Sequence, residues 1–178
     1  MKKLALIALL LASAATQAQV VKSAETEVSF FSKSPVEDIS ALTKKTTAAI
    51  NLDSRAIAFS VPIKSFVFTN GLMQEHFNEN YLESSKYPNA SFKGKINENV
   101  DLKKDGTYNV TSTGKLNIHG VEQDRTLDGT ITVKNGLITL NSAFKVKLVD
   151  HRIEVPTLVT KNIAEVIDVK LKAKFNNL

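Results

Sequence analysis

Hydrophobic and polar residues alternate along most of the chain. The clearest case is its last segment, where every second residue is apolar: Ile167, Val169, Leu171, Ala173 and Phe175. Because successive side chains of a strand point to opposite faces, a period of two predicts a strand with one buried face. The alternation recurs at 57–63, 90–96, 108–118, 127–133 and 138–148, and more weakly at 27–32 and 46–52. The chain is therefore predicted to form about eight strands.

Turn signals separate these strands at 53–55, 104–106 and 134–136. Asn135-Gly136 is typical of a two-residue hairpin, whose central residues both need positive φ. Consecutive antiparallel strands with one apolar face must cover that face, and eight of them can do so by closing into a barrel. A sandwich of two sheets is the competing arrangement. No long linker interrupts the pattern, so we predict one all-β domain over 19–178.

Ser34-Pro35-Val36-Glu37 is a helix-start signal, with a capping residue, a proline at the first helical position and a glutamate at the third. Val36, Ile39 and Leu42 would then share one face of a short helix.

A second helix is predicted within 70–85. Asn70 can cap it, and the residues that share one face are Leu72, Met73, His76 and Phe77. Asn78-Glu79-Asn80 is expected to end it. We expect this helical connection to pack over one end of the barrel.

The first 18 residues have the layout of a secretory signal peptide. Two lysines precede an apolar run from Leu4 to Ala12, and small residues follow up to Ala18. The run is about half the length that a membrane-spanning helix needs. We therefore expect cleavage after Ala18 and a periplasmic or secreted bacterial protein without a stable membrane insertion.

Charge and composition exclude several functions. The formal net charge of +5 falls to +3 without Lys2 and Lys3, and the remaining lysines are spread along the chain, which argues against nucleic-acid binding. The absence of cysteine excludes thiolate metal sites, disulfides and cysteine nucleophiles.

The three histidines give no clear catalytic or metal site. His76, His119 and His151 lie far apart, and no pair has the i, i+4 spacing of a helical metal site. The chain has no G-x-S-x-G, dinucleotide-binding or P-loop motif. We expect no catalytic residue, no metal and no cofactor, although an enzyme that uses His76 or His119 stays a minor alternative.

Two blocks of sequence resemble the YceI family. The first block is Met73-Gln74-Glu75-His76-Phe77, followed by Tyr81 to Pro88 and by Ala90-Ser91-Phe92. The second runs from Gly106 to Val121 and is similar to that family's "G-x-L-T-x-H-G-V" element, here Gly114-Lys115-Leu116-Asn117-Ile118-His119-Gly120-Val121. The two blocks have the separation expected for the family, and the strand pattern that goes with them covers nearly the whole chain after residue 18.

The resemblance implies a lipocalin-like antiparallel barrel with an elongated apolar cavity. It also implies binding of a long isoprenoid or other amphiphilic lipid, such as a polyprenyl carrier or an isoprenoid quinone, and a role in lipid handling or stress responses of the cell envelope. The sequence departs from the usual motif, because Met73-Gln74 stand where the family has Arg-Asp. Recognition of an anionic diphosphate headgroup is therefore in doubt.

Strand parity selects the residues that would line such a cavity. The apolar lining is predicted to include Phe59, Val61, Phe92, Tyr108, Val110, Ile131, Val133, Phe144, Val146 and Leu171. A polar headgroup would meet His76, Asn78 and Tyr81 at the mouth. Several inward positions are small or polar, and they would either accommodate large neighbours or leave room for a ligand: Ser112, Gly114, Gly129 and Ser142. The alternative is a solid barrel that serves as a structural or protein-interaction module, and pairing of two copies stays open.

Overall fold

A computed structural model describes residues 19–33, 38–155 and 163–176. Among these residues no helix is long and apolar enough to cross a bilayer. The strands are β1 (Val20–Ser32), β2 (Ile39–Thr43), β3 (Thr47–Asn51), β4 (Ala56–Pro62), β5 (Val67–Phe68), β6 (Asn89–Ile96), β7 (Gly106–Ile118), β8 (Val121–Lys134), β9 (Leu137–Lys147) and β10 (Val166–Asn176). The helical turns are η1 (Ile63–Ser65), α1 (Gly71–His76), η2 (Phe77–Tyr81) and η3 (Val149–His151).

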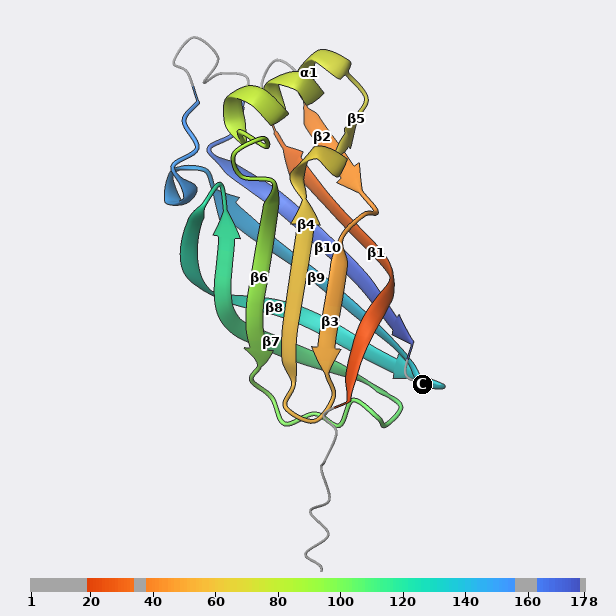
Figure 1. Cartoon of the computed structure of the whole chain (residues 1–178). Coiled ribbons are helices and arrows are strands. Elements are labelled where there is room, and N and C mark those ends of the chain that lie inside the picture. Colours follow the sequence, from red (N-terminus) through yellow and green to blue (C-terminus); the bar gives the residue numbers. More distant parts are fainter. Residues whose placement is uncertain (1–18, 34–37, 156–162, 177–178) are drawn as a thin grey trace, which may run out of the picture.

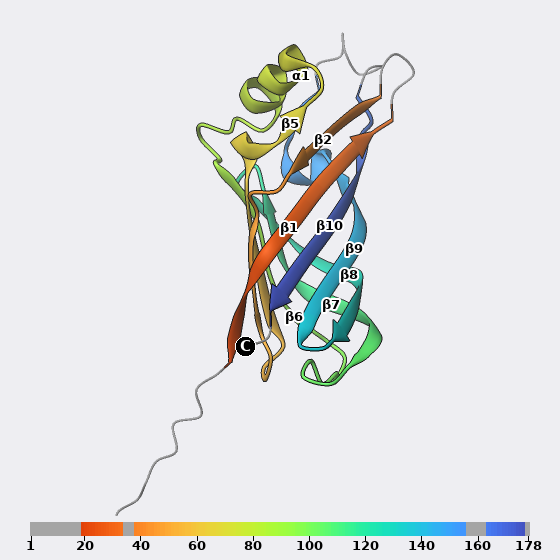
Figure 2. The ribbon, with the colours of Figure 1, turned by 90° about the vertical axis from the view of Figure 1, so that its right-hand side faces the viewer.

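Eight of the described strands close into an antiparallel barrel. Their order is β1-β3-β4-β6-β7-β8-β9-β10, and β10 pairs with β1 to complete the ring. Figures 1 and 2 show the barrel from two sides, with α1 over one end, called here the upper end; the lower end carries the hairpin turns at 52–55 and 135–136. The predicted barrel is confirmed, and the two-sheet sandwich is excluded.

The predicted Asn-Gly hairpin is also confirmed. Asn135 has φ 50° and Gly136 has φ 77°, so both central residues occupy the left-handed region that this turn needs. The turn joins β8 to β9 with Lys134 opposite Leu137.

The helix predicted to include Ile39 and Leu42 is wrong, because both residues lie in β2. This strand pairs with residues 28–32 of β1, above the point where β1 leaves β3, and β5 pairs with β2 in turn. Pairing with an otherwise open strand edge outweighs the local helix signal. Residues 34–37, which carry that signal, lie outside the described residues.

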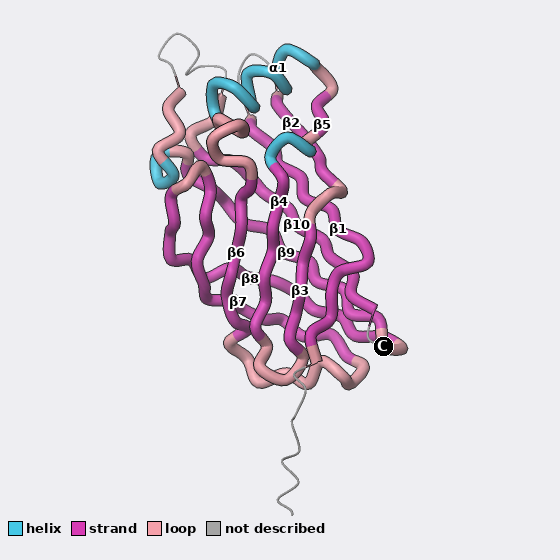
Figure 3. Tube along the Cα trace, viewed as in Figure 1, coloured by secondary structure: helices cyan, strands magenta, loops and turns pink. Residues whose placement is uncertain are grey.

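The second helix forms as predicted, and Asn70 caps it by accepting hydrogen bonds from the backbone N–H groups of Leu72 and Met73. It does not end at 78–80, because the wider helical turn η2 continues to Tyr81. The side-chain amide of Asn78 donates to the carbonyl oxygen of Gln74 (2.8 Å). Figure 3 shows these helical turns lying across the upper end of the strands.

The lower part of the barrel is a packed hydrophobic core. Six large side chains in it are essentially inaccessible to solvent: Ile50, Ile96, Leu102, Ile131, Ile138 and Phe175. These residues come from five strands and from the loop before β7, so the lower end is solid.

Gly114 does not leave room for a ligand. It pairs directly with Gly94, and a Cβ added to Gly114 would lie 2.3 Å from the carbonyl oxygen of Lys93. The backbones of β6 and β7 therefore approach each other too closely for any side chain at this position.

Gly114→Ala is expected to lower the free energy of unfolding by about 1–3 kcal/mol, because the β6 backbone must move. Gly71→Ala is the matched control, since a Cβ at Gly71 meets nothing within 4 Å. The control should be neutral or slightly stabilising. Urea denaturation of both variants tests this, and equal stability of the two would contradict the close approach.

Candidate ligand-binding cavity

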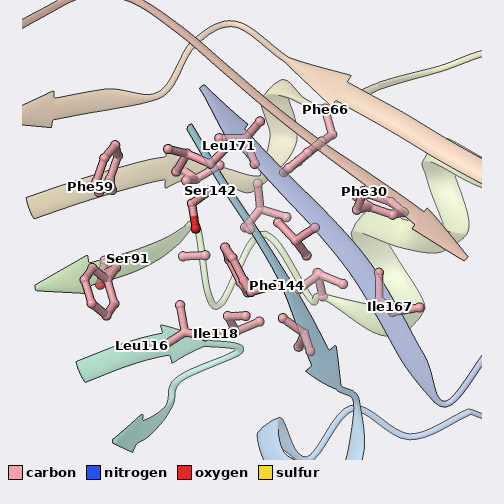
Figure 4. Close-up of a pocket in the computed structure, with 18 of the residues that line it drawn as sticks. Phe30, Phe59, Phe66, Ser91, Leu116, Ile118, Ser142, Phe144, Ile167 and Leu171 are labelled. Atoms are coloured by element: carbon pink, nitrogen blue, oxygen red, sulfur yellow. The ribbon is translucent and has the colours of Figure 1, made fainter. Parts of the chain in front are cut away.

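The upper part of the barrel is hollow. A cavity of about 450 Å³ lies above the packed core, within the range of small-molecule sites. Residues from seven barrel strands surround it, and α1 and η2 lie over it. Figure 4 shows Phe59, Leu116, Phe144 and Leu171 around this space, together with the small side chain of Ser142.

Seven of the ten residues predicted as apolar lining face this cavity: Phe59, Val61, Phe92, Val110, Phe144, Val146 and Leu171. Tyr108, Ile131 and Val133 do not, although they have the same inward parity. They pack in or against the lower core, and the Tyr108 hydroxyl donates to the carbonyl oxygen of Lys104 (3.0 Å). The alternation of residues shows on which face of a strand a side chain lies, but it does not show how far along the barrel axis that side chain lies.

Of the three residues predicted at the polar mouth, two line the cavity and one does not. His76 is exposed at the edge of the cavity, and Tyr81 lines it half-buried. Burial raises the pKa of the Tyr81 phenol, so this group stays protonated at physiological pH and can donate a hydrogen bond. Asn78 lies outside the lining, and its side-chain amide is hydrogen-bonded to the carbonyl oxygen of Gln74.

Four phenylalanines gather at the upper end of the cavity. The ring of Phe30 lies 5.4 Å from those of Phe66 and Phe77, and Phe68 lies 5.0 Å from Phe77 between ring centroids. All four rings line the cavity. The sequence predicts Phe77 on the inner helical face but assigns no element to Ser65-Phe66-Val67-Phe68. The signal that could have found this segment is its run of three apolar residues, Phe66 to Phe68.

Three of the four small inward positions line the cavity: Ser112, Gly129 and Ser142. The Ser142 hydroxyl donates to the carbonyl oxygen of Asp128 (2.5 Å), so this polar group is satisfied within the wall. Small side chains at this height widen the interior, as barrels that enclose ligands require.

The lining carries almost no charge. Within the part of the chain that the structure describes, no lysine or arginine lines the cavity, and the single carboxylate, Asp128, is exposed at its edge. The thioether of Met73 lines it instead. Gln74 has a structural role, because its side-chain oxygen accepts a hydrogen bond from the Phe68 N–H (3.2 Å). The electrostatics of the cavity thus favour an uncharged ligand.

Residues 19–175 match the model of the YceI-like domain. The chain belongs to the YceI-like family. Three solved structures share the YceI-like fold. BcnA of Burkholderia cenocepacia is 20% identical with a TM-score of 0.71, and the match covers 84% of this chain and 95% of that protein.

A polyisoprenoid binding domain from Saccharophagus degradans, described as implicated in plant cell wall breakdown, is 12% identical with a TM-score of 0.73, covering 91% of this chain and all of that domain. The YCEI protein of Campylobacter jejuni is 20% identical with a TM-score of 0.63, covering 76% of this chain and 83% of that one. At these identities the likeness shows the fold alone. No curated protein matches the sequence.

His119 and His151 of this YceI-like domain hold the upper end together and lie outside the cavity lining. Nε2 of His119 is 2.7 Å from a carboxylate oxygen of Glu83, and Nδ1 donates to the carbonyl oxygen of His151 (3.2 Å). The His151 ring is fully buried, and its Nδ1 donates to the carbonyl oxygen of Val121 (3.1 Å). These contacts join the segment after η2, the β7–β8 turn and η3.

Among the described residues, no group of three potential metal ligands gathers around either histidine. Burial lowers the pKa of His151 below its usual value near 6.5, and the hydrogen bond to Val121 opposes this shift. The native state therefore holds the ring neutral at a pH where the unfolded chain binds a proton.

The free energy of unfolding should consequently fall below about pH 6.5, by up to about 1.4 kcal/mol per pH unit, until the lowered pKa is reached. His151→Asn keeps a donor toward Val121 but cannot titrate, so this part of the pH dependence should disappear. Urea denaturation at pH 7.5, 6.5 and 5.5 measures both proteins. The same slope in both would show that His151 titrates normally.

Proposed function

We propose that this YceI-like protein binds one uncharged, largely hydrocarbon molecule in its upper cavity and serves as a carrier or store for it. An isoprenoid quinone, a polyprenol or a neutral fatty chain has the required chemistry. The observation that carries the proposal is a cavity of about 450 Å³ whose wall is apolar and lacks fixed positive charge among the described residues.

Burial of hydrocarbon supplies the affinity. Each methylene moved from water into the cavity contributes about 0.8 kcal/mol, so ten of them supply roughly 8 kcal/mol before the loss of ligand freedom is subtracted. The protonated Tyr81 phenol and the exposed His76 ring could hydrogen-bond to a quinone carbonyl or an alcohol at the edge. The polyisoprenoid binding of the Saccharophagus domain with the same fold supports this ligand class.

The hollow upper part favours binding over the alternative of a solid interaction module.

We also infer a binding protein rather than an enzyme. His119 is already engaged with Glu83 and the backbone of His151, which leaves His76 as the histidine at the cavity edge. Neither the unaltered protein nor its His76→Ala variant should convert the bound ligand into a product. Product formation by the unaltered protein that is lost in His76→Ala would overturn the inference.

We infer further that residues 1–18 are removed on export and that the protein works in the periplasm or outside the cell, where it supports lipid handling or an envelope stress response. The apolar run after Lys2-Lys3 supports export. The mass of the protein isolated from its own cells tests it, because a cleaved chain begins at Gln19.

Filling the cavity should abolish ligand uptake. Ser112→Phe places a ring inside, whereas Thr113→Phe places the same ring on the exposed face of the same strand. We expect at least a tenfold loss of farnesol binding in the first variant only, measured by displacement of a fluorescent lipid probe. Thermal melts confirm that both variants fold, and unchanged binding by a folded Ser112→Phe would contradict the cavity as the site.

The uncharged lining should discriminate between headgroups. Farnesol is expected to bind at least tenfold more tightly than farnesyl diphosphate, because no lysine or arginine among the described lining residues offsets the desolvation of the diphosphate. Met73→Arg should reduce or reverse this preference by placing a guanidinium at the cavity wall, and Met73→Leu is the control for shape. Tighter binding of the diphosphate by the unaltered protein would contradict the proposal.

A further inference from the structure

The cavity of this barrel ends abruptly on a solid floor. Its lowest lining residues include Val110 on β7, Gly129 on β8, Leu140 on β9 and Leu171 on β10. The next inward residue toward the lower end of each strand lies outside the lining: Tyr108, Ile131, Ile138 and Ala173. Ile131, Ile138 and Ala173 are completely buried, and Tyr108 packs against them in the lower core.

Leu140 is part of this floor. It is paired with Ile131 of β8 on one side and with Ala173 of β10 on the other. All three residues belong to the hydrophobic core, but only Leu140 lines the cavity. Leu140 therefore lies at the boundary between the hollow part of the barrel and the packed part.

The opposite end is bounded as well. The rings of Phe30, Phe66, Phe68 and Phe77 pack on one another with centroids 5.0–5.7 Å apart. A ligand that extends beyond the cavity must separate these rings or leave part of its chain in water. The space is therefore limited in length at both ends.

The extent of the lining along the strands gives the limit. It runs from Leu140 to Val146 on β9 and from Val110 to Ile118 on β7, which is about 20 to 27 Å along the strands and about 15 to 20 Å along the axis of a tilted barrel. An extended hydrocarbon chain of this length contains about 12 to 16 carbon atoms along its backbone, or roughly three to four isoprene units.

We propose that the floor at Leu140 restricts the ligand to a chain of about three to four isoprene units, or a neutral fatty chain of similar length. This inference rests on the proposed function and narrows its ligand class. A longer polyisoprenoid gains nothing from the additional units, because the solid core below the floor does not admit them.

A series of isoprenols with identical hydroxyl heads tests the limit. Geraniol, farnesol, geranylgeraniol and solanesol contain two, three, four and nine isoprene units, and each can be delivered from cyclodextrin to the delipidated protein. Affinity should rise at least tenfold from geraniol to geranylgeraniol and by less than about threefold from geranylgeraniol to solanesol. A continued steep rise to solanesol would overturn the length limit and leave the proposed function intact. Failure of all four alcohols to bind would overturn both.

Two variants move the floor in opposite directions. Leu140→Ala opens space toward the lower core, so the affinity ratio of geranylgeraniol to farnesol should increase several-fold. Ser142→Leu fills space just above the floor, so the same ratio should decrease. Asn141→Ala, at the exposed position between them, is the matched control and should keep the ratio of the unaltered protein.

The ratio is read on folded protein only, as verified by thermal melts. If Leu140→Ala does not fold, Ser142→Leu alone decides the question. An unchanged ratio in folded Ser142→Leu would show that Leu140 and its surroundings do not set the chain length.

Discussion

Pairing between β1 and β10 joins the two ends of the described chain and closes the barrel. It runs from Ser23 opposite Phe175 to Phe31 opposite Asp168, with one irregularity near Ser23. Without it, both strands would present unpaired edges, and the apolar inner face of the sheet would meet water. The pairing of β1 with β10 encloses the apolar face of every strand of the barrel. The packed core and the cavity both depend on this closure.

The enclosed space is divided by height into two parts with different physical roles. Large aliphatic and aromatic side chains fill the lower part and provide the burial that stabilises the fold. At the upper part Ser112, Gly129 and Ser142 leave space that the surrounding large residues do not fill. The same strands therefore serve stability at one end and binding at the other.

Much of this fold could be predicted from the sequence, because the period of two is a direct consequence of strand geometry. The strands of the barrel, the Asn135-Gly136 turn and the Asn70 cap followed from local signals, whereas the choice of a barrel over a sandwich rested on the resemblance to the YceI family. The β2 strand did not, since it depends on pairing with a distant edge. The height of Ile131 in the barrel and the close approach at Gly114 are likewise properties of the assembled sheet.

The most direct test of a hollow, ligand-filled barrel is native mass spectrometry of the protein isolated from its own cells, followed by organic extraction of the same sample. The account predicts one neutral lipid per chain, released when the protein unfolds and identified in the extract. A homogeneous ligand-free mass that also stays unchanged after incubation with farnesol and geranylgeraniol would contradict it.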